Sequence, residues 1–311
     1  MTQNVSAEHA PNRVLAFSLE RPIFVMLILY FIAWLFKLLD NHILRLDELL
    51  GEAILTKSLG FLLVAAYVWA CGRKLSDIGF HTRFLGKTLL IAGVSVLLLY
   101  LVAYTAQVIQ LRASGEEAAF VLSAIDPRTG ISGGLGFAIW LLSANLVNSA
   151  MEEGLFRGTM VRHFLIPFSA RGALLLQATL FALWHLNWPI RNLLDGKATI
   201  GEAAFEAFAL LLGTFIGGLV YGYLYFKTDN LWGAFLAHTI NNGIFNILFI
   251  SAGGVIKSGL DFGLFTAIFL IGHLLLLPVI YLAAKRLEMP EVKPWGEFGE
   301  QAETLARSVA Y

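Results

Sequence analysis

Charge is scarce in this 311-residue sequence: Asp, Glu, Lys and Arg make up 14% of its residues, whereas soluble domains carry about 25%. The acidic and basic residues balance to a net charge of zero, so nothing favours nucleic acid as a partner. The single cysteine, Cys71, excludes an intramolecular disulfide and is expected to be an inert buried residue. No cleavable signal peptide is expected, because residues 1–21 are polar and the first apolar run lacks a small-residue cleavage pattern.

Long apolar runs are abundant, and hydrophobic residues make up 58% of the chain. Runs of about 20 apolar residues are typical of transmembrane helices, so we predict an all-α polytopic membrane protein with about eight helices in one bundle. The transmembrane domain is expected over 22–286, its catalytic core over about 134–250, and polar tails over 1–21 and 287–311. The predicted spans are Pro22–Leu39, Ala53–Cys71, Thr88–Leu111, Gly134–Glu152, Arg171–Leu186, Glu202–Phe226, Leu231–Ile250 and Phe262–Ala284.

The loops between these spans predict an orientation. With eight spans both termini lie on one side, and the loops of that side carry about twice as many Lys and Arg residues as the other loops. Because cytoplasmic loops are enriched in Lys and Arg, we expect both termini in the cytoplasm, with the long polar loop Arg112–Gly133 on the outer side.

The segment Met151–Gly158 places two glutamates and an arginine at the end of an apolar run. Such residues cost ~2.5–3.5 kcal/mol each at membrane depth, so they mark a candidate functional site. Glu153 and Arg157 are four residues apart and are expected to pair on one helix face. Glu152 points to another face, which it shares roughly with Asn145 and Asn148.

Two histidines are predicted to lie at the depth of Glu152. If the fourth and fifth spans form an antiparallel hairpin, the midpoint between Glu152 and His185 falls in the turn Ile166–Ser169, so the two residues should lie at similar depth. The seventh span brings in His238, followed by Asn242 on the same face one turn later. We therefore expect Glu152, His185, His238 and Asn242 to meet within the membrane.

This set of residues supports more than one chemistry. A carboxylate beside an imidazole can deprotonate a water and later protonate a leaving amine, while a His and an Asn can donate to an oxyanion, which suits amide hydrolysis. Two histidines and a glutamate could instead bind zinc, although the HExxH pattern is absent. A proton or solute path would also place polar groups in a membrane.

The sixth span contains two pairs of glycines at small-xxx-small spacing, Gly213 with Gly217 and Gly218 with Gly222. This spacing is typical of close helix–helix contact, so we expect these glycines to pack helices and to have no chemical role.

Three motifs stand in one order along the chain: EExxxR at Glu152–Arg157, FxxxH at Phe181–His185 and HxxxN at His238–Asn242. Together they resemble the CPBP family, the CAAX proteases and bacteriocin-processing enzymes that are also called the Abi family. The segment Thr228–Gly233 and the segment Leu75–Phe80 are also similar to that family. The motifs cover about residues 150–245, and the first 130 residues match in layout more than in sequence.

The resemblance implies an eight-helix intramembrane endopeptidase without a metal cofactor. By motif position, Glu152 with His185 would activate water, and His238 with Asn242 would form the oxyanion site, with Glu153 and Arg157 completing the first motif. The implied partner is a membrane-embedded peptide or protein, either a CAAX-type prenylated tail or a bacterial peptide. The implied location is a prokaryotic cytoplasmic membrane. A zinc-dependent protease, a transporter and a non-proteolytic scaffold or immunity protein stay open as alternatives.

Overall fold

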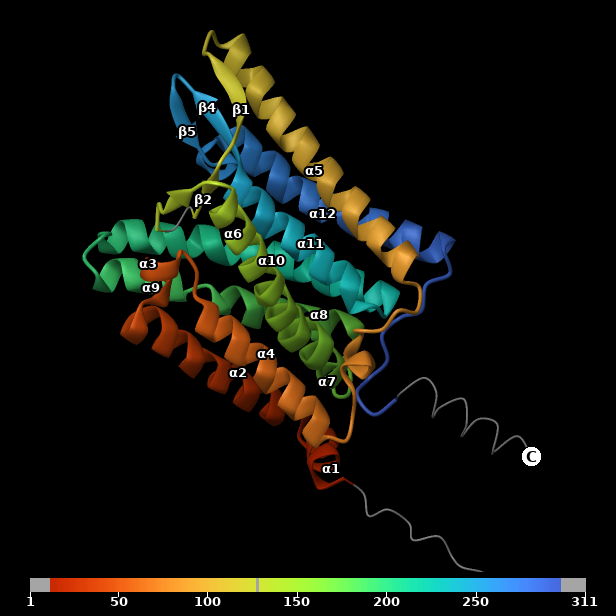
Figure 1. Ribbon diagram of the computed structural model, residues 1–311. Helices are drawn as coiled ribbons and strands as arrows, with labels where there is room; N and C mark the ends of the chain where they lie inside the picture. Colours follow the sequence, from red (N-terminus) through yellow and green to blue (C-terminus); the bar gives the residue numbers. More distant parts are fainter. Residues whose placement is uncertain (1–11, 127–128, 298–311) are drawn as a thin grey trace, which may run out of the picture.

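The computed structural model describes residues 12–126 and 129–297, which are mostly helical (Figure 1). The helices are α1 (Arg13–Glu20), α2 (Pro22–Leu38), η1 (Leu39–Leu44), α3 (Leu46–Leu50), α4 (Ile54–Ala70), η2 (Leu75–Ile78), α5 (Leu85–Ala113), α6 (Leu135–Glu152), η3 (Glu153–Val161), α7 (Arg162–Phe164), α8 (Ala170–Trp184), α9 (Asn187–Leu194), α10 (Ile200–Thr228), α11 (Leu231–Ile247), η4 (Gly259–Asp261) and α12 (Gly263–Arg286).

A helix lies at each of the eight predicted spans, but not all of these helices have the length of a membrane crossing. Among the described residues, four are long and apolar enough to cross: Pro22–Leu44, Leu85–Ala113, Ile200–Thr228 and Gly263–Arg286. The helices α4, α6, α8 and α11 at the other positions are shorter or more polar. The number of eight membrane crossings therefore stays a prediction.

The helix α6 occupies the middle of the bundle. It packs against α4 on one side and α11 on the other, and α4 in turn packs on α2 while α11 packs on α5 (Figure 1). Two clusters of buried apolar side chains result, one mainly from α5, α10, α11 and α12, the other from α2, α4, η3 and α8. The segment with the first motif thus lies at the junction of both apolar cores.

The predicted loop Arg112–Gly133 contains strands instead of being wholly irregular. The strand β1 (Ala118–Leu122) pairs antiparallel with β4 (Leu248–Ala252), which pairs with β5 (Val255–Lys257), and β2 (Ala124–Ile125) pairs with β3 (Ser132–Gly133). Because β4 begins at Leu248, the seventh helix is shorter than the predicted span. The 29 residues of α5 extend ~43 Å at 1.5 Å per residue, which exceeds the ~30 Å thickness of a hydrocarbon core.

The prediction for the four glycines of α10 is confirmed for one pair and wrong for the other. A Cβ at Gly218 would lie 3.3 Å from Ala178 Cα, and a Cβ at Gly222 would lie 2.4 Å from Gln177 Nε2, so these two positions let α10 approach α8 closely. A Cβ at Gly213 or Gly217 would meet nothing within 4 Å, so these two positions make no close helix contact; Gly217 points to another face of α10 than its neighbour Gly218.

The described parts of both predicted tails are packed against the bundle. Helix α1 includes Ser18, whose hydroxyl accepts a hydrogen bond from the Trp295 indole at 3.2 Å. Trp295 is 2% exposed and stacks on His163. The N-terminal and C-terminal described segments therefore lie at the same end of the bundle, as the even number of spans predicts.

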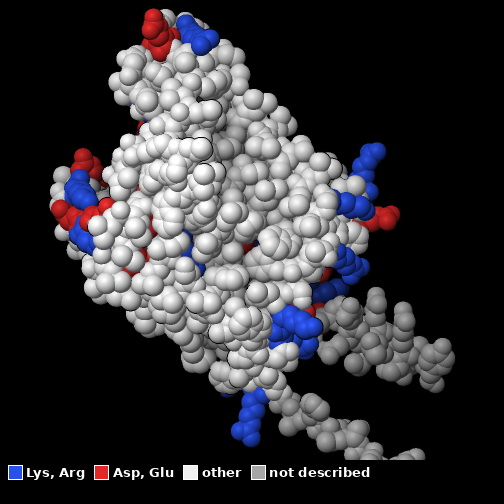
Figure 2. Space-filling model, in the orientation of Figure 1, with Lys and Arg blue, Asp and Glu red and all other residues white. Residues whose placement is uncertain are grey.

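Charged side chains lie mainly at the periphery of the face in Figure 2, and a broad, largely uncharged surface separates them. At the end opposite to the termini they form ion pairs. Arg191 of α9 binds Asp47 at 2.6 Å, and Arg45 binds Asp195 at 2.5 Å and Glu48 at 2.6 Å. The hydrogen bonds from Arg45 lower the pKa values of the Glu48 and Asp195 carboxyl groups.

Candidate active site

The first motif begins where the helix changes its hydrogen-bonding pattern. Helix α6 ends at Glu152, and Glu153–Val161 continues as the π-helix η3. Such π-helical turns are rare and frequently occur at functional sites. A Cβ at Gly158 would lie 3.1 Å from the Ile78 carbonyl oxygen, so glycine allows η2 to contact the motif directly. The motif helix also continues to Phe164, beyond the predicted end of the fourth span.

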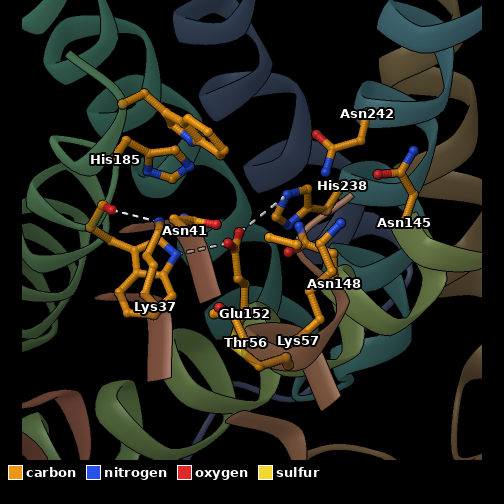
Figure 3. Close-up of a pocket in the computed structure, with 14 residues that line it drawn as sticks. Lys37, Asn41, Thr56, Lys57, Asn145, Asn148, Glu152, His185, His238 and Asn242 are labelled. Carbon is orange, nitrogen blue, oxygen red and sulfur yellow. Dashed lines mark hydrogen bonds and ion pairs between the residues drawn. The ribbon is translucent and has the colours of Figure 1, made fainter. Parts of the chain in front are cut away.

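Glu152 presents one carboxylate oxygen to protein and the other to a cavity. Its Oε1 accepts a hydrogen bond of 2.9 Å from the Trp184 indole N–H. Its Oε2 has no hydrogen-bond partner among the described residues and lies 3.5 Å from His238 Nε2. The residue is 5% exposed, and Figure 3 shows its carboxylate at the centre of the cavity, between His185 and His238.

Glu153 has two partners, of which the sequence predicted one. Its Oε1 lies 3.1 Å from Arg157 Nη1, in agreement with the predicted pairing of positions four apart. The same oxygen also lies 2.7 Å from His238 Nδ1, a contact that the sequence analysis missed. Glu153 thereby fixes the orientation of the His238 ring and leaves Nε2 to face Glu152.

Arg157 is an unusual buried cation. Its side chain is 0% exposed, and none of its three guanidinium nitrogens has a hydrogen-bond partner in the described part of the chain. Its guanidinium lies 4.0 Å from the centre of the Phe181 ring and 5.8 Å from that of Tyr221. Glu153 and these aromatic faces are therefore what compensates the buried charge.

The tautomer of His185 follows from its position at the end of α8. Its Nδ1 lies 2.8 Å from the Phe181 carbonyl oxygen. Because a carbonyl only accepts hydrogen bonds, Nδ1 carries the proton, and Nε2 of the neutral ring is an acceptor. His185 lines the same cavity as Glu152, as the hairpin argument predicts, while the contacts of the Glu152 carboxylate are with Trp184 and His238.

The cavity brings together all the residues that were expected to meet. Asn242 lies along α11 beside His238, and Asn145 and Asn148 of α6 complete that wall (Figure 3). The Asn242 amide oxygen accepts a hydrogen bond of 3.2 Å from Asn241, so its NH₂ group is directed elsewhere. About 60 Å³ is open to water, enough for several molecules, since one water needs ~10–15 Å³ by this measure.

Among the other residues that line the cavity, three polar ones from the N-terminal helices were not singled out by sequence reasoning. Lys37 and Asn41 come from the end of α2 and from η1, and Lys57 comes from α4 (Figure 3). Lys37 and Lys57 are each 5% exposed and Asn41 is 0% exposed. Lys57 is buried within α4 and ion-paired with Glu52.

Among the described residues, no three or more His, Cys, Asp or Glu side chains are arranged to hold a metal ion. In particular, His238 Nδ1 is engaged by Glu153.

Comparison with known families adds an independent finding. Residues 134–244 match the Rce1-like family, described as type II CAAX prenyl endopeptidase Rce1-like. This part of the chain is therefore similar to that family. No curated protein and no solved structure matches the chain.

The matched residues cover α6, η3 and the helices up to α11, which supply the three motifs and both histidines. The matched family is a protease family, so the match confirms the resemblance to the CAAX proteases. Together with the four apolar helices, it indicates an integral membrane protein. Lys37, Asn41 and Lys57 lie outside the matched residues.

Proposed function

We propose that this protein is an intramembrane endopeptidase that hydrolyses a peptide bond with a water activated by Glu152. The observation that carries the proposal is the environment of the Glu152 Oε2 atom. This oxygen lacks a hydrogen-bond partner among the described residues, faces a polar cavity and lies 3.5 Å from His238 Nε2. An ionised carboxylate only accepts hydrogen bonds, so a water beside Oε2 would donate a hydrogen bond to it.

In this mechanism Glu152 and His185 act on the same water. Both present acceptors to the cavity, Oε2 of Glu152 and Nε2 of His185. As the water oxygen bonds to the scissile carbonyl carbon, its proton passes to Glu152, which then delivers it to the leaving amine nitrogen. Trp184 holds the other Glu152 oxygen and keeps the carboxylate directed into the cavity.

His238 and Asn242 would stabilise the oxyanion of the tetrahedral intermediate. Because His238 Nδ1 donates to the Glu153 carboxylate, donation from Nε2 requires that both ring nitrogens carry protons. Asn242 would donate from its NH₂ group, because its amide oxygen already accepts from Asn241. Glu153 is then a positioning residue, and Arg157 is its counter-charge.

The substrate is proposed to be a membrane-associated peptide or protein, either a CAAX-type prenylated tail or a bacterial peptide. The description of the matched family supports the prenylated CAAX-type tail. A buried cavity among apolar helices supports a substrate that reaches it from the bilayer. The protein is proposed to lie in a prokaryotic cytoplasmic membrane with both termini in the cytoplasm.

The test is cleavage of a fluorogenic farnesylated CAAX peptide and of a membrane-peptide library by the purified protein in detergent. The Glu152→Gln variant keeps the size of the side chain and should lose the ~10²–10⁴-fold contribution of a general base. Glu206→Gln is the matched control, since Glu206 binds Asn192 away from this cavity. Equal turnover by both variants would refute the assignment of Glu152.

Two further measurements separate the other candidate functions. If zinc were required, turnover would be lost on metal stripping with a chelator and restored by stoichiometric zinc. If the polar cluster were a transport path, vesicles would show Glu152-dependent flux without a peptide product. A scaffold or immunity protein would give neither cleavage nor flux.

A further inference from the structure

The wall of the cavity formed by the N-terminal helices is rich in hydrogen-bond donors. It contains the ammonium groups of Lys37 and Lys57 and the amide of Asn41 (Figure 3). All three residues are buried, with exposed fractions of 5%, 5% and 0%. Buried lysines are rare because desolvating an ammonium group is costly. Here Glu52 pairs with Lys57, and Lys37 donates to the Trp184 carbonyl oxygen, so each ammonium has a protein partner and retains further N–H donors.

Asn41 points to a ligand independently of the lysines. Neither its Nδ2 nor its Oδ1 has a hydrogen-bond partner among the described residues. An unsatisfied buried amide costs about 1–3 kcal/mol, so such groups are normally found where something binds. Asn41 lines the cavity, where its NH₂ group is able to donate to an incoming acceptor.

The position of Lys37 relates this wall to the proposed reaction centre. Its Nζ lies 4.0 Å from the centre of the Trp184 ring and donates to the Trp184 carbonyl oxygen at 2.7 Å. The same indole donates to Glu152 on its other side at 2.9 Å. An extended peptide advances ~3.3–3.6 Å per residue, so a group near Lys37 would lie within a few residues of the bond attacked at Glu152.

We propose that Lys37, Asn41 and Lys57 form a subsite for a substrate carboxylate close to the scissile bond. The chemistry is that of a charge-assisted hydrogen bond, in which a carboxylate accepts from ammonium and amide donors. This inference rests on the proposed function and adds a substrate requirement to it. The carboxylate could be the C-terminus of the peptide or an acidic side chain near the bond.

The experiment compares three farnesylated peptides of one sequence in detergent: the free C-terminal acid, the C-terminal amide, and the amide with a Glu placed after the scissile bond. We expect the free acid to exceed the plain amide in kcat/KM by about 10- to 100-fold, the usual effect of charge-assisted hydrogen bonds. If the Glu-containing amide is cleaved as efficiently as the free acid, an acidic side chain is sufficient to supply the carboxylate. Preference for the free acid alone would identify the C-terminus.

Variants then locate the preference in the subsite. Lys37→Met should reduce the ratio of acid to amide turnover about tenfold or more, and Asn41→Asp should reduce or invert it by repulsion. Lys87→Met is the control, because Lys87 binds the Leu287 carbonyl oxygen outside the cavity and should leave the ratio unchanged. A lysine that served only as counter-charge to Glu152 would lower turnover of both peptides equally and leave the ratio intact.

The outcomes distinguish a failed subsite from a failed enzyme. Equal cleavage of all three peptides, or an unaltered ratio in Lys37→Met and Asn41→Asp, would overturn the subsite while leaving the peptidase intact. Absence of Glu152-dependent cleavage of every peptide would overturn the proposed function and the subsite with it.

Discussion

Replacing Glu153 by Gln removes the carboxylate that faces both Arg157 and His238 while preserving the volume of the side chain. Arg157 is 0% exposed, and its nitrogens have no hydrogen-bond partner among the described residues, so its charge would be left without its ion-pair partner in an apolar core. Breaking a buried pair by removing one partner costs about 3–5 kcal/mol. The stacking on Phe181 persists in the variant and limits the loss.

Glu152→Gln is expected to behave differently. The side-chain amide oxygen of this variant can still accept the hydrogen bond from Trp184, and Glu152 is not the direct partner of Arg157. Loss of a single hydrogen bond lowers the free energy of unfolding by only about 1 kcal/mol. Glu152→Gln should therefore abolish turnover with near-normal folding, whereas Glu153→Gln should lose both turnover and stability.

The double variant Glu153→Gln/Arg157→Met separates the two roles of Glu153. Replacing a buried ion pair by apolar groups is often neutral, so this variant should regain most of the free energy of unfolding lost in Glu153→Gln. It should not regain turnover, because His238 would still lack the carboxylate at Nδ1. Denaturant unfolding in detergent micelles and peptide cleavage are the two assays. Equal stability of the Glu152 and Glu153 single variants, or no recovery in the double variant, would refute this reasoning.

Three other predictions concern separate parts of the molecule. Asn242→Ala should lower turnover about 10²–10³-fold as one oxyanion donor is lost, and Asn242→Asp should be worse because it adds a negative charge there; steady-state kinetics decides. Gly158→Val should lower the midpoint of thermal unfolding, because even a Cβ would lie 3.1 Å from the Ile78 carbonyl oxygen, and Gly154→Ala, with its nearest neighbour at 3.4 Å, should be milder. The hydrogen bonds from Arg45 lower the pKa of Glu48, so this contact stabilises the fold above the ordinary carboxyl pKa of about 4 and is lost as the pH falls through the lowered value. The free energy of unfolding, measured as a function of pH, should fall over this range in the wild type and should fall less in Arg45→Met.

Hydropathy and helix geometry are enough to predict the main helices and the meeting of the motif residues. The run that ends at Glu152 is apolar because α6 is packed between α4 and α11. His185 and His238 reach the same cavity, as expected from the depth of a hairpin and of a helix entering beside it. The pairing of Glu153 with Arg157 also follows from local spacing alone.

The features that were missed depend on contacts between segments far apart in sequence. The strands β1 and β4 pair Leu122 with Leu248, and pairing between such distant positions leaves no local signal. The π-helix η3 has no distinctive composition, and its presence changes which face each side chain occupies. Lys37 lies within the predicted span Pro22–Leu39, and a lysine near a helix end usually extends to the interface. Here the tertiary contact with Trp184 determines its position instead.

Burial of Trp295 has a consequence for the order in which the chain can assemble. Its indole closes over Ser18 of α1 and stacks on His163 of α7 and Tyr67 of α4, so one residue near the end covers three early segments. During synthesis, the first helices enter the membrane long before residue 295 emerges, at about 5–20 residues per second. Until then Tyr67 and His163 can form their 2.6 Å hydrogen bond but lack the ring that covers them. The packing around Trp295 is therefore completed last. A variant truncated before Trp295 should be cleaved more readily by protease at α1, even if the cavity around Glu152 has formed.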